Sequence, residues 1–574
     1  MKRFTDLKDG QYLHPDLTKS RSARDASDLS KFIEWFQCHN PFDGGQPELV
    51  SLTTGLSTSE GDGVNCDQTE SVGSLIQRTM DNKCILDVKI PKKHHIKTLQ
   101  HLEPSVEIDG EKIQVDPTIL FMRCMAITKR MEIESPAPFF KHEMTNYPVS
   151  MFKDYFMRHA EKSELANILI EKKPNFVNEA DSELITIVDG GWLLNKVRWS
   201  KNTTFEQVAD QYKKYVYNHF GIASIVIFDG YEMSTTKDHE HLRRNLGKKI
   251  SPSVCIQSST ITKYDQDVFF RNAGNKTKFI ELLSSTFKEA NIATKTARGD
   301  ADTIIVSEAL LLARNGQTVQ IACNDTDVLV MALYHYDACT MSDIRIHRET
   351  TVKKRTRIQN ISISKLSENI PDLIKEHILF IHAFSGCDTT SQIYGHSKSW
   401  LLKPIEKQTV HSLVHSSSQT SVRSASSQLL NILCSGEDYE NLTEARYNKL
   451  QKMIASCDAL DPKRLPPTES AAENHGLRVH LQVAQWASLD EFCLNPTEWG
   501  WKQSKNGLVP ILTDLPVAPT DILKFIICNC KAKKNQCGSN HCSCVKHGLK
   551  CVEACGHCGG QQCKNTPNID MSED

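Results

Sequence analysis

Residues Thr296 to His335, TARGDADTIIVSEALLLARNGQTVQIACNDTDVLVMALYH, hold two pairs of aspartates on either side of one helical pattern. Asp300 and Asp302 precede the pattern. Asp325 and Asp327 follow the apolar stretch after it. The order is an acid pair, a helix, a strand and a second acid pair, which is typical of a repeating unit in an α/β sheet.

The residues between the two pairs support this interpretation. Gly316 is placed to end the helix, and the residues VQIAC at 319–323 are typical of a short buried strand. Acids at a helix start and just beyond a strand's carboxyl end lie where open parallel sheets bind ligands. We therefore expect the four carboxylates to converge, which is unfavourable unless cations bind them. The apolar side chains at helical spacing are Ile304, Ile305, Ala309, Leu311 and Leu312.

Each aspartate also has a plainer explanation. Asp300 could be the N-cap of the helix and Asp325 a turn residue, because aspartate accepts local hydrogen bonds at both positions. Taken singly, such a residue is more often structural than functional.

Two further strands end in an acid. The residues 183–191 (ELITIVDGG) and 223–230 (ASIVIFDG) are apolar and β-branched, and they deliver Asp189 and Asp229. Between them, Phe205 to Phe220 has helical spacing, so the order predicts a right-handed βαβ unit. Repetition of the same device makes coincidence a weaker explanation.

A basic stretch and a seventh acid complete the pattern. Lys237 and Arg244 lie seven residues apart, two helical turns, and so share a face. Such a helix suits a phosphodiester substrate, although on composition alone a solvated helix face is the better explanation. An apolar helix at 376–384 then leads to Asp388.

This order of motifs resembles the flap endonuclease and XPG branch of the PIN-like nucleases, over roughly residues 184–403. The resemblance implies an α/β fold with a PIN-like parallel sheet and helices on both faces. It also implies two Mg²⁺ or Mn²⁺ ions that cut DNA phosphodiesters, with Lys237 and Arg244 contacting the scissile phosphate. The implied metal ligands are Asp189, Asp229, Asp300, Asp302, Asp325, Asp327 and Asp388.

The chain differs from that family in two places. The family usually has glutamates where Asp300 and Asp302 stand, and its glycine-rich hairpin turn is reduced to one glycine at 391–398. An alternative therefore stays open: a DNA-binding or chromatin protein whose PIN-like domain is a catalytically silent scaffold. No Gly-x-x-x-x-Gly-Lys sequence occurs, so ATP hydrolysis has no support.

Nine of the 20 cysteines crowd into residues 528–565, a segment too short for an apolar core. We expect structural zinc to supply the folding free energy, with disulfides as the lesser alternative. Three tetrahedral zinc ions would require three bridging sulfurs. The ligands would be Cys528, Cys530, Cys537, Cys542, Cys544, Cys551, Cys555, Cys558 and Cys563.

The spacing of these cysteines resembles the tesmin/TSO1-like CXC domain, a zinc module that binds DNA. Six lysines face one glutamate in this segment, whereas the whole chain has a net charge of -2. A local basic patch of this kind can bind phosphates. The candidate nucleic-acid contacts are Lys531, Lys533, Lys534, Lys546, Lys550 and Lys564.

The 574 residues are long enough for several domains. We expect a poorly defined N-terminal region (1–115), a helical lead-in (116–180), the PIN-like nuclease domain (181–405), a linker and helical region (406–500), a connector (501–527) and the CXC-type zinc domain (528–565). Within them, residues 117–170 have helical spacing that includes Met151 and Phe156, and the serine-rich stretch at 415–428 is typical of a linker.

The sequence thus predicts a metal-dependent nuclease targeted to DNA by a zinc module, of mobile-element type because residues 465–528 resemble a segment of transposon-related metazoan proteins. RNA stays open as a substrate. The absence of an apolar signal or membrane span in the sequence suggests a nuclear protein, otherwise a cytoplasmic one, that is not secreted and has no membrane partner.

Overall fold

The structure is a computed structural model of the chain. It describes residues 66–81, 105–108, 111–130, 135–171, 184–200, 202–230, 235–245, 250–352, 355–401, 418–435, 439–456, 460–489, 494–504, 507–528, 536–552 and 563–565, together with isolated residues elsewhere.

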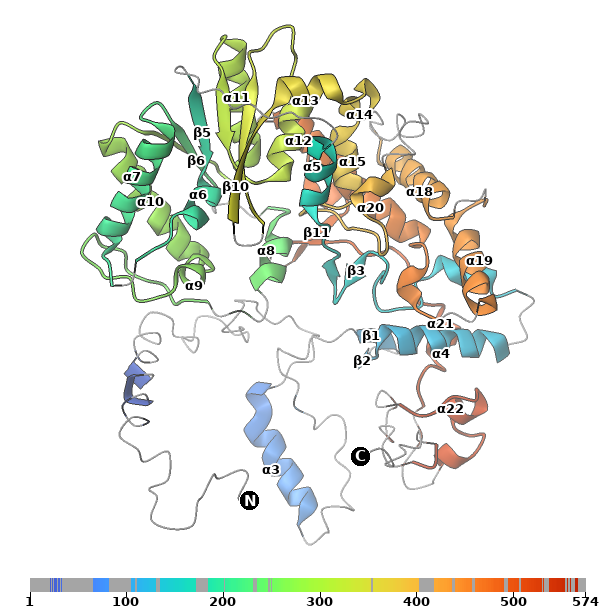
Figure 1. The fold of residues 1–574 in the computed structure, drawn as a ribbon. Coiled ribbons are helices and arrows are strands. Elements are labelled where there is room, and N and C mark those ends of the chain that lie inside the picture. Colours follow the sequence, from blue (N-terminus) through green and yellow to red (C-terminus); the bar gives the residue numbers. More distant parts are fainter. Residues whose placement is uncertain are drawn as a thin grey trace.

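A six-stranded sheet forms the centre of the α/β part (Figure 1). Its strand order is β10-β9-β8-β5-β6-β7, and all neighbours pair in parallel except β10, which is antiparallel to β9. The predicted parallel α/β sheet is confirmed. The strands are β5 (Ile185–Asp189), β6 (Ile225–Phe228), β7 (Ala293–Thr296), β8 (Val319–Ala322), β9 (Ile344–Val352) and β10 (Arg355–Ser362).

Successive residues of the central strands face two different cores. Ile187 and Ile227 join one core, whereas their neighbours Val188 and Val226 join the other. This alternation is the period of a β-strand, and it explains why both faces of the sheet are apolar and covered by helices. One face packs against α7 (Phe205–Phe220) and α10 (Ala273–Glu289), and the other against α11 (Asp302–Arg314) and α12 (Thr326–His335).

The remaining helices near the sheet are short. They are α6 (Gly190–Lys196), α8 (Asp238–Asn245), α9 (Gln266–Phe270), α13 (Ile363–Asn369), α14 (Asp372–Glu376), α15 (Ile378–Phe384) and the 3-10 turn η7 (Lys398–Leu401).

The described part of the lead-in region contains two α-helices and the 3-10 helix η6 (Ala137–Lys141). Helices α4 (Pro117–Arg130) and α5 (Lys162–Glu171) confirm the prediction there. The predicted helix through Met151 and Phe156 is wrong, because β3 (Phe152–Lys153) and β4 (Phe156–Met157) form a hairpin. Its two turn residues have φ of 52° and 66°, a left-handed conformation that cannot continue a right-handed helix.

The predicted serine-rich linker is also wrong from residue 419 onward, while residues 402–417 lie outside the described part of the chain. Helix α18 (Gln419–Ser435) packs on α20 (Glu469–Ser488), with α19 (Leu442–Ala455) between them in sequence. Small side chains permit this contact. A Cβ on Gly476 of α20 would lie 2.3 Å from Cβ of Ser426, whose hydroxyl donates to the Ala472 carbonyl. The serines therefore serve close helix packing.

Helix α20 also packs against α15, so the described helices of residues 418–488 share one core with the sheet. The aromatic segment after α20 forms a hairpin of β11 (Trp501–Ser504) and β12 (Gly507–Pro510). Trp501 is buried, which confirms the expectation that this segment belongs to the core.

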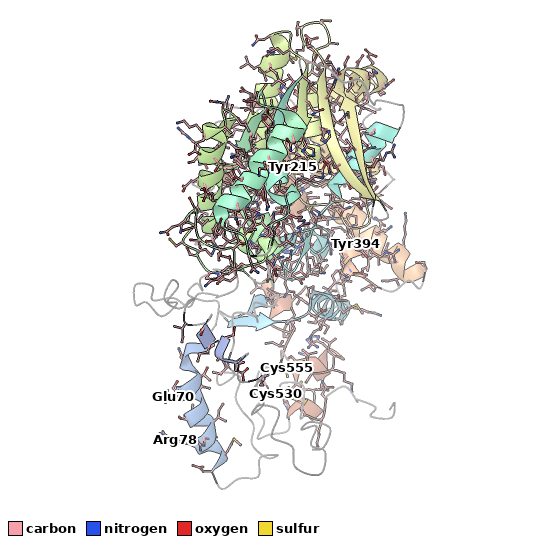
Figure 2. All side chains as sticks on the ribbon, turned by 60° about the vertical axis from the view of Figure 1, so that its left-hand side comes forward. Glu70, Arg78, Tyr215, Tyr394, Cys530 and Cys555 are labelled. Carbon is pink, nitrogen blue, oxygen red and sulfur yellow. The ribbon has the colours of Figure 1, made fainter. Side chains whose placement is uncertain are left out.

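A second body lies beyond this hairpin. Strand β1 (Ser105–Ile108), helix α4, part of α19 and helix α21 (Thr520–Leu523) form one apolar cluster with the cysteine segment, which contains α22 (Ser543–Lys546). Strand β1 pairs antiparallel with β2 (Glu111–Gln114). Figure 2 shows Tyr215 of α7 toward one end of the molecule and Cys530 and Cys555 toward the other. Helix α3 (Thr69–Met80) has no buried residue. None of the described helices is both long and apolar enough to cross a bilayer.

Gly230, directly after Asp229, offers a test of how tightly the acid-bearing strand ends are packed. A Cβ at this position would lie 2.0 Å from the backbone oxygen of Ala297. We expect Gly230→Ala to lower the free energy of unfolding by about 1–3 kcal/mol, because the backbone must shift. Chemical denaturation measures the change.

Gly274→Ala is the matched control. Gly274 lies in the first turn of α10, where a Cβ would meet only Asn272 Oδ1 at 3.4 Å. This variant should keep or slightly raise stability, by up to about 1 kcal/mol. Equal stabilities of the two variants would contradict the close approach at Gly230.

Candidate functional site

Seven aspartates meet at one edge of the sheet. Asp189 ends β5 and Asp229 follows β6. Two further pairs follow β7 and β8, and the seventh acid follows α15. Because β5 to β8 are parallel, their carboxyl ends lie at the same edge, as the sequence predicted.

Local hydrogen bonds orient two of these acids. Asp189 caps α6, and its Oδ1 accepts from the N–H groups of Gly191 (2.8 Å) and Trp192 (3.2 Å). Asp325 caps α12 through the N–H of Asp327 (2.9 Å). A local structural role therefore holds for Asp325, whereas the N-cap explanation for Asp300 is wrong. Asp300 does not cap α11, whose N-cap is Ala301 without a side-chain bond.

Asp189 and Asp229 face each other across Gly191. A Cβ on Gly191 would lie 3.2 Å from Asp189 Oδ1 and 3.4 Å from Asp229 Oδ2. Burial, followed by the charge of Asp229, raises the pKa of Asp189 to about 7. Asp229 accepts from the N–H of Ala301 (3.1 Å), and Lys276 Nζ lies 3.9 Å from its other oxygen. This half of the cluster is rich in uncompensated negative charge.

Lys237 lies between Asp300 and Asp302, the two acids that follow β7. Its Nζ is 2.6 Å from Asp300 Oδ2 and 2.7 Å from Asp302 Oδ2. Burial alone would lower the pKa of Lys237, but the two aspartates outweigh it and raise that pKa well above its usual value. The predicted basic residue thus touches the acids themselves.

Lys162, at the start of α5, was not predicted from the sequence. Its Nζ lies 2.8 Å from Asp327 Oδ2, 2.9 Å from Asp388 Oδ2 and 3.8 Å from Asp325 Oδ1. The only sequence signal was a single lysine at the start of a helical pattern. Its partners lie 163 or more positions away in the chain, so local patterns could not have found it.

Arg244, the second predicted basic residue, pairs with two acids. It donates to Asp388 Oδ1 (3.0 Å) from Nη2 and to Glu240 Oε1 (2.8 Å) from Nε. Glu240 is buried and also accepts from Arg243. His159, Glu240 and Asp388 each have one potential ligand atom, and these three atoms lie within 4.8 Å of one another. The last turn of α8 therefore borders the cluster.

A buried relay supports Asp327. His382 Nε2 donates to Asp327 Oδ1 (2.7 Å), and Lys398 Nζ lies 3.1 Å from His382 Nδ1. The ring of Trp486 stacks on His382 with centroids 5.4 Å apart. Burial, with the charge of Lys398, lowers the pKa of His382 to about 4. The imidazole is therefore neutral at neutral pH, and one tautomer serves both neighbours.

The relay also sets the charge of Asp327. Burial alone would raise the pKa of Asp327, but Lys162 and His382 outweigh it and hold this pKa well below its usual value. Asp327 is therefore ionised despite being almost fully buried. Burial lowers the pKa of Lys398 to about 8.

The donor set fits hard divalent cations. Seven carboxylates converge, but direct ion pairs within 3.0 Å come only from Lys162, Lys237 and Arg244 among the described residues. Oxygen ligands with excess negative charge are what Mg²⁺ and Mn²⁺ prefer. Such ions would polarise a bound phosphodiester and activate water.

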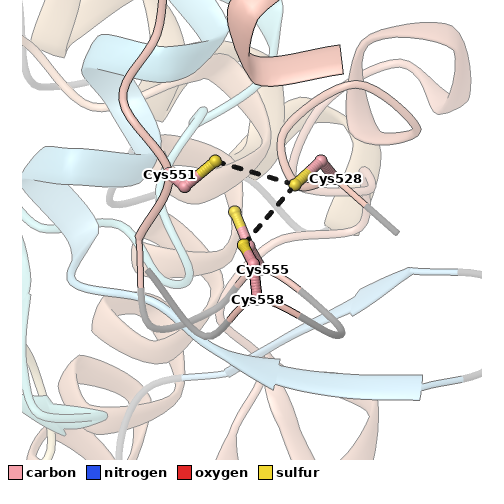
Figure 3. Close-up of side chains that lie close together, drawn as sticks. All are labelled: Cys528, Cys551, Cys555 and Cys558. Atoms are coloured by element: carbon pink, nitrogen blue, oxygen red, sulfur yellow. Dashed lines mark hydrogen bonds between the residues drawn. The ribbon is translucent and has the colours of Figure 1, made fainter. Parts of the chain in front are cut away.

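The nine C-terminal cysteines form the second candidate site. All are free thiols, and eight are buried. The sulfur atom of Cys528 lies 3.8 Å from the sulfur of Cys551 and 3.8 Å from that of Cys558 (Figure 3). A tetrahedral zinc with Zn–S bonds of about 2.3 Å spaces its sulfurs about 3.8 Å apart, so the cluster can bind zinc.

The sulfurs fall into overlapping groups of four. One group is Cys528, Cys530, Cys537 and Cys542, and another is Cys528, Cys551, Cys555 and Cys558. Two more groups use Cys544 and Cys563 with members of these. Sharing of Cys528 and Cys551 among groups is what bridging thiolates require. The expected count of three zinc ions stays a prediction.

An arginine of α4 holds the cysteine segment. Arg123 is buried and donates to the carbonyls of Ile526 (2.6 Å) and Lys550 (2.8 Å) and to Cys544 Sγ (2.9 Å). No pattern in the sequence indicated this contact. Of the candidate DNA contacts, Lys546, Lys550 and Lys564 are exposed, whereas Lys531, Lys533 and Lys534 lie outside the described residues.

A substitution of Lys398 tests the buried hydrogen-bond chain that runs from Lys398 through His382 to Asp327. It also donates to the carbonyls of His382 (3.1 Å) and Gly386 (2.6 Å). Lys398→Met should lower the free energy of unfolding by about 2–4 kcal/mol, because buried acceptors lose their donor. Lys365→Met, at an exposed position of α13, should change it by less than about 0.5 kcal/mol. Urea unfolding of both variants checks the relay, and a Lys398 variant as stable as the control would contradict it.

Comparison with known proteins does not assign the chain to a family of known function. Residues 3–143 match a family model described as a domain of unknown function (DUF8702), which covers α4 but neither the sheet nor the cysteine segment. No curated protein matches the chain.

Several solved structures are similar to about half of the chain. The catalytic core of Rad2 in complex with DNA substrate is 16% identical, with 48% of this chain and 75% of that chain covered and a TM-score of 0.25. The T5 D15 protein co-crystallised with metal ions is 13% identical, with 54% and 100% covered and a TM-score of 0.27. The eukaryotic junction-resolving enzyme GEN-1 binding with cesium is 12% identical, with 57% and 75% covered and a TM-score of 0.28.

Proposed function

We propose that this protein is a divalent-metal-dependent nuclease that hydrolyses DNA phosphodiester bonds at the seven-aspartate cluster. The observation that carries the proposal is the convergence of acids from four parallel strand ends and α15 on one another, with basic side chains between them. Such an arrangement is costly to fold unless cations bind to it, so it has a function beyond stability.

The roles divide among the residues as follows. Asp189, Asp229, Asp300, Asp302 and Asp325 offer oxygens to divalent cations, which would activate water and stabilise the leaving oxygen. Lys237 and Arg244 now bind acids of the cluster. A phosphodiester entering beside α8 would give both side chains an alternative anionic partner, which holds the substrate at the acids.

The cysteine segment supplies a separate DNA contact in this proposal. Zinc would hold its fold, and the exposed Lys546 and Lys550 would bind phosphates without reading sequence. With DNA as the substrate, we propose a nuclear location; the mobile-element origin rests on the resemblance of residues 465–528 alone.

A second candidate function has its own support. Both oxygens of Asp327 and both of Asp388 are already bound by donors of the chain itself. Internal neutralisation of this kind would suit a DNA-binding scaffold that does not cut.

Cleavage assays decide between the two. Labelled single-stranded, flap and hairpin DNA and the matching RNAs should be incubated with Mg²⁺, Mn²⁺ or EDTA. Asp325→Asn keeps an acceptor for the cap of α12 but removes the charge. It should slow cleavage at least about 100-fold, because a bound metal contributes several kcal/mol of charge stabilisation.

Asp265→Asn is the matched control, at the exposed N-cap of α9, and should leave the rate unchanged. Undiminished cleavage by the Asp325 variant would remove the cluster from the reaction. Binding without cleavage of any substrate by the wild type would favour the silent scaffold.

The cysteine segment requires point variants. Truncation near Leu523 would cut through the apolar cluster that joins the segment to α4. Exchange of Cys542 and Cys544 for Ser should release zinc and weaken DNA binding about 10-fold or more, most strongly at low salt. Metal-dependent cleavage at high substrate concentration should persist.

Exchange of Cys255 and Cys339 for Ser, at exposed positions outside the cluster, should change neither property. Zinc content by elemental analysis and fluorescence anisotropy at several salt concentrations provide the measurements. Full DNA affinity of the zinc-free variant would exclude the segment as the targeting module.

A further inference from the structure

The acid cluster has two halves that differ in how their oxygens are bound. In one half, Asp327 Oδ1 accepts from His382 and Oδ2 from Lys162. Asp388 Oδ1 accepts from Arg244, and its Oδ2 is 2.9 Å from Lys162 Nζ. All four oxygens are therefore bound by the chain's own donors.

The other half is open. The only donors to Asp189 among the described residues are two backbone N–H groups, and both bind Oδ1. The one ion pair that Asp229 Oδ2 makes with a described side chain is with Lys276 Nζ, at 3.9 Å. Lys237 binds a single oxygen of Asp300 and of Asp302. Oxygens therefore stay available for a cation on this side.

Lys162 is held as a structural cation would be. Its side chain is 13% exposed, and its ammonium group lies within 4 Å of three carboxylates that come from α12, from the residue before it and from the loop after α15. Two of these carboxylates, Asp327 and Asp388, lie within 3.0 Å of Nζ, and the third, Asp325, is an ion-pair partner at 3.8 Å. Helix α5 packs against α12, which fixes the backbone from which Lys162 extends.

We propose that Lys162 is a built-in cation that takes the place of one divalent ion, so that the acid cluster binds one divalent ion at Asp189, Asp229 and Asp325 instead of two. This inference rests on the proposed function, and it narrows the metal requirement of that site. A second divalent ion at Asp327 and Asp388 would have to displace a buried ammonium group from three anionic partners, because like charges at that distance repel strongly.

In this proposal one divalent ion and the Lys162 ammonium group have different roles in hydrolysis. Asp189, Asp229 and Asp325 would hold the divalent ion, which would activate water and polarise the phosphodiester at the open half. Lys162, with Arg244, neutralises Asp327 and Asp388 of the other half. Its ammonium group also lies 3.8 Å from Oδ1 of Asp325, which lies between the two halves and is held there by this charge. Lys162 is in this sense a positioning residue.

Counting bound Mn²⁺ tests the proposal without any activity measurement. The full-length, zinc-loaded protein is titrated with Mn²⁺, and free and bound ions are separated by electron paramagnetic resonance, with calorimetry as a second readout. Thiolate sites favour zinc over manganese, so the cysteine segment does not interfere. The wild type should bind one Mn²⁺ tightly and show the signal of an isolated ion.

Lys162→Met should bind two Mn²⁺ ions and show magnetic coupling between them. Its thermal stability should be lower than wild type without Mn²⁺ and rise more than wild type on Mn²⁺ addition, because the second ion replaces the lost charge. Lys162→Arg keeps the charge and should bind one ion. Lys295→Met, at an exposed lysine paired with Glu308, should behave like the wild type.

Two coupled Mn²⁺ ions in the wild type would overturn the proposal and leave the nuclease function intact, and this result is decisive even where Lys162→Met does not fold. A Lys162→Met protein that folds yet binds one ion would overturn it as well. No Mn²⁺ bound by either protein would instead refute the metal site of the proposed function.

Discussion

Repulsion among buried carboxylates is the constraint on which the rest of the structure depends. Seven aspartates lie at one sheet edge, and Asp189 already shows the consequence, since burial and its neighbour raise its pKa to about 7. Ionic partners reach the cluster from α5, from the start and end of α8, and from α10. The surrounding helices are arranged so that their cations point at this edge. A stable fold and a cation site are therefore two aspects of one charge distribution.

The helices after the sheet complete this site. Helix α20 contributes Trp486 against His382, and η7 contributes Lys398 behind it. Each group satisfies the next, from a buried lysine through a neutral imidazole to an ionised aspartate. Thr389, next to Asp388, donates to the side-chain oxygen of Gln482 in α20. Residues nearly one hundred positions apart in sequence thereby fix the orientation of acids that the sheet only brings near one another.

The cysteine segment likewise contacts a part of the chain that is distant in sequence, helix α4. Arg123 donates to Cys544 Sγ and to the Lys550 carbonyl of the segment, as well as to the carbonyl of Ile526 just before it, and α4 shares an apolar cluster with the segment. A hydrogen bond to a thiolate reduces its negative charge, which matters where nine sulfurs crowd together. The N-terminal region that matches DUF8702 thus contacts the C-terminal cysteine segment directly.

Much of this protein was determined by the sequence alone. Apolar strands ending in aspartate predicted the parallel sheet and the convergence of Asp189, Asp229, Asp300, Asp302, Asp325, Asp327 and Asp388, because strand period and helix stops are local properties. The cysteine spacing predicted a metal cluster for the same reason. Local periodicity misjudged Met151–Phe156 and the serines of α18, where left-handed turn residues and close helix packing prevailed. Tertiary structure alone decided the positions of Lys162, His382, Lys398 and Arg123, because an ion pair between distant segments leaves no periodic trace in the chain.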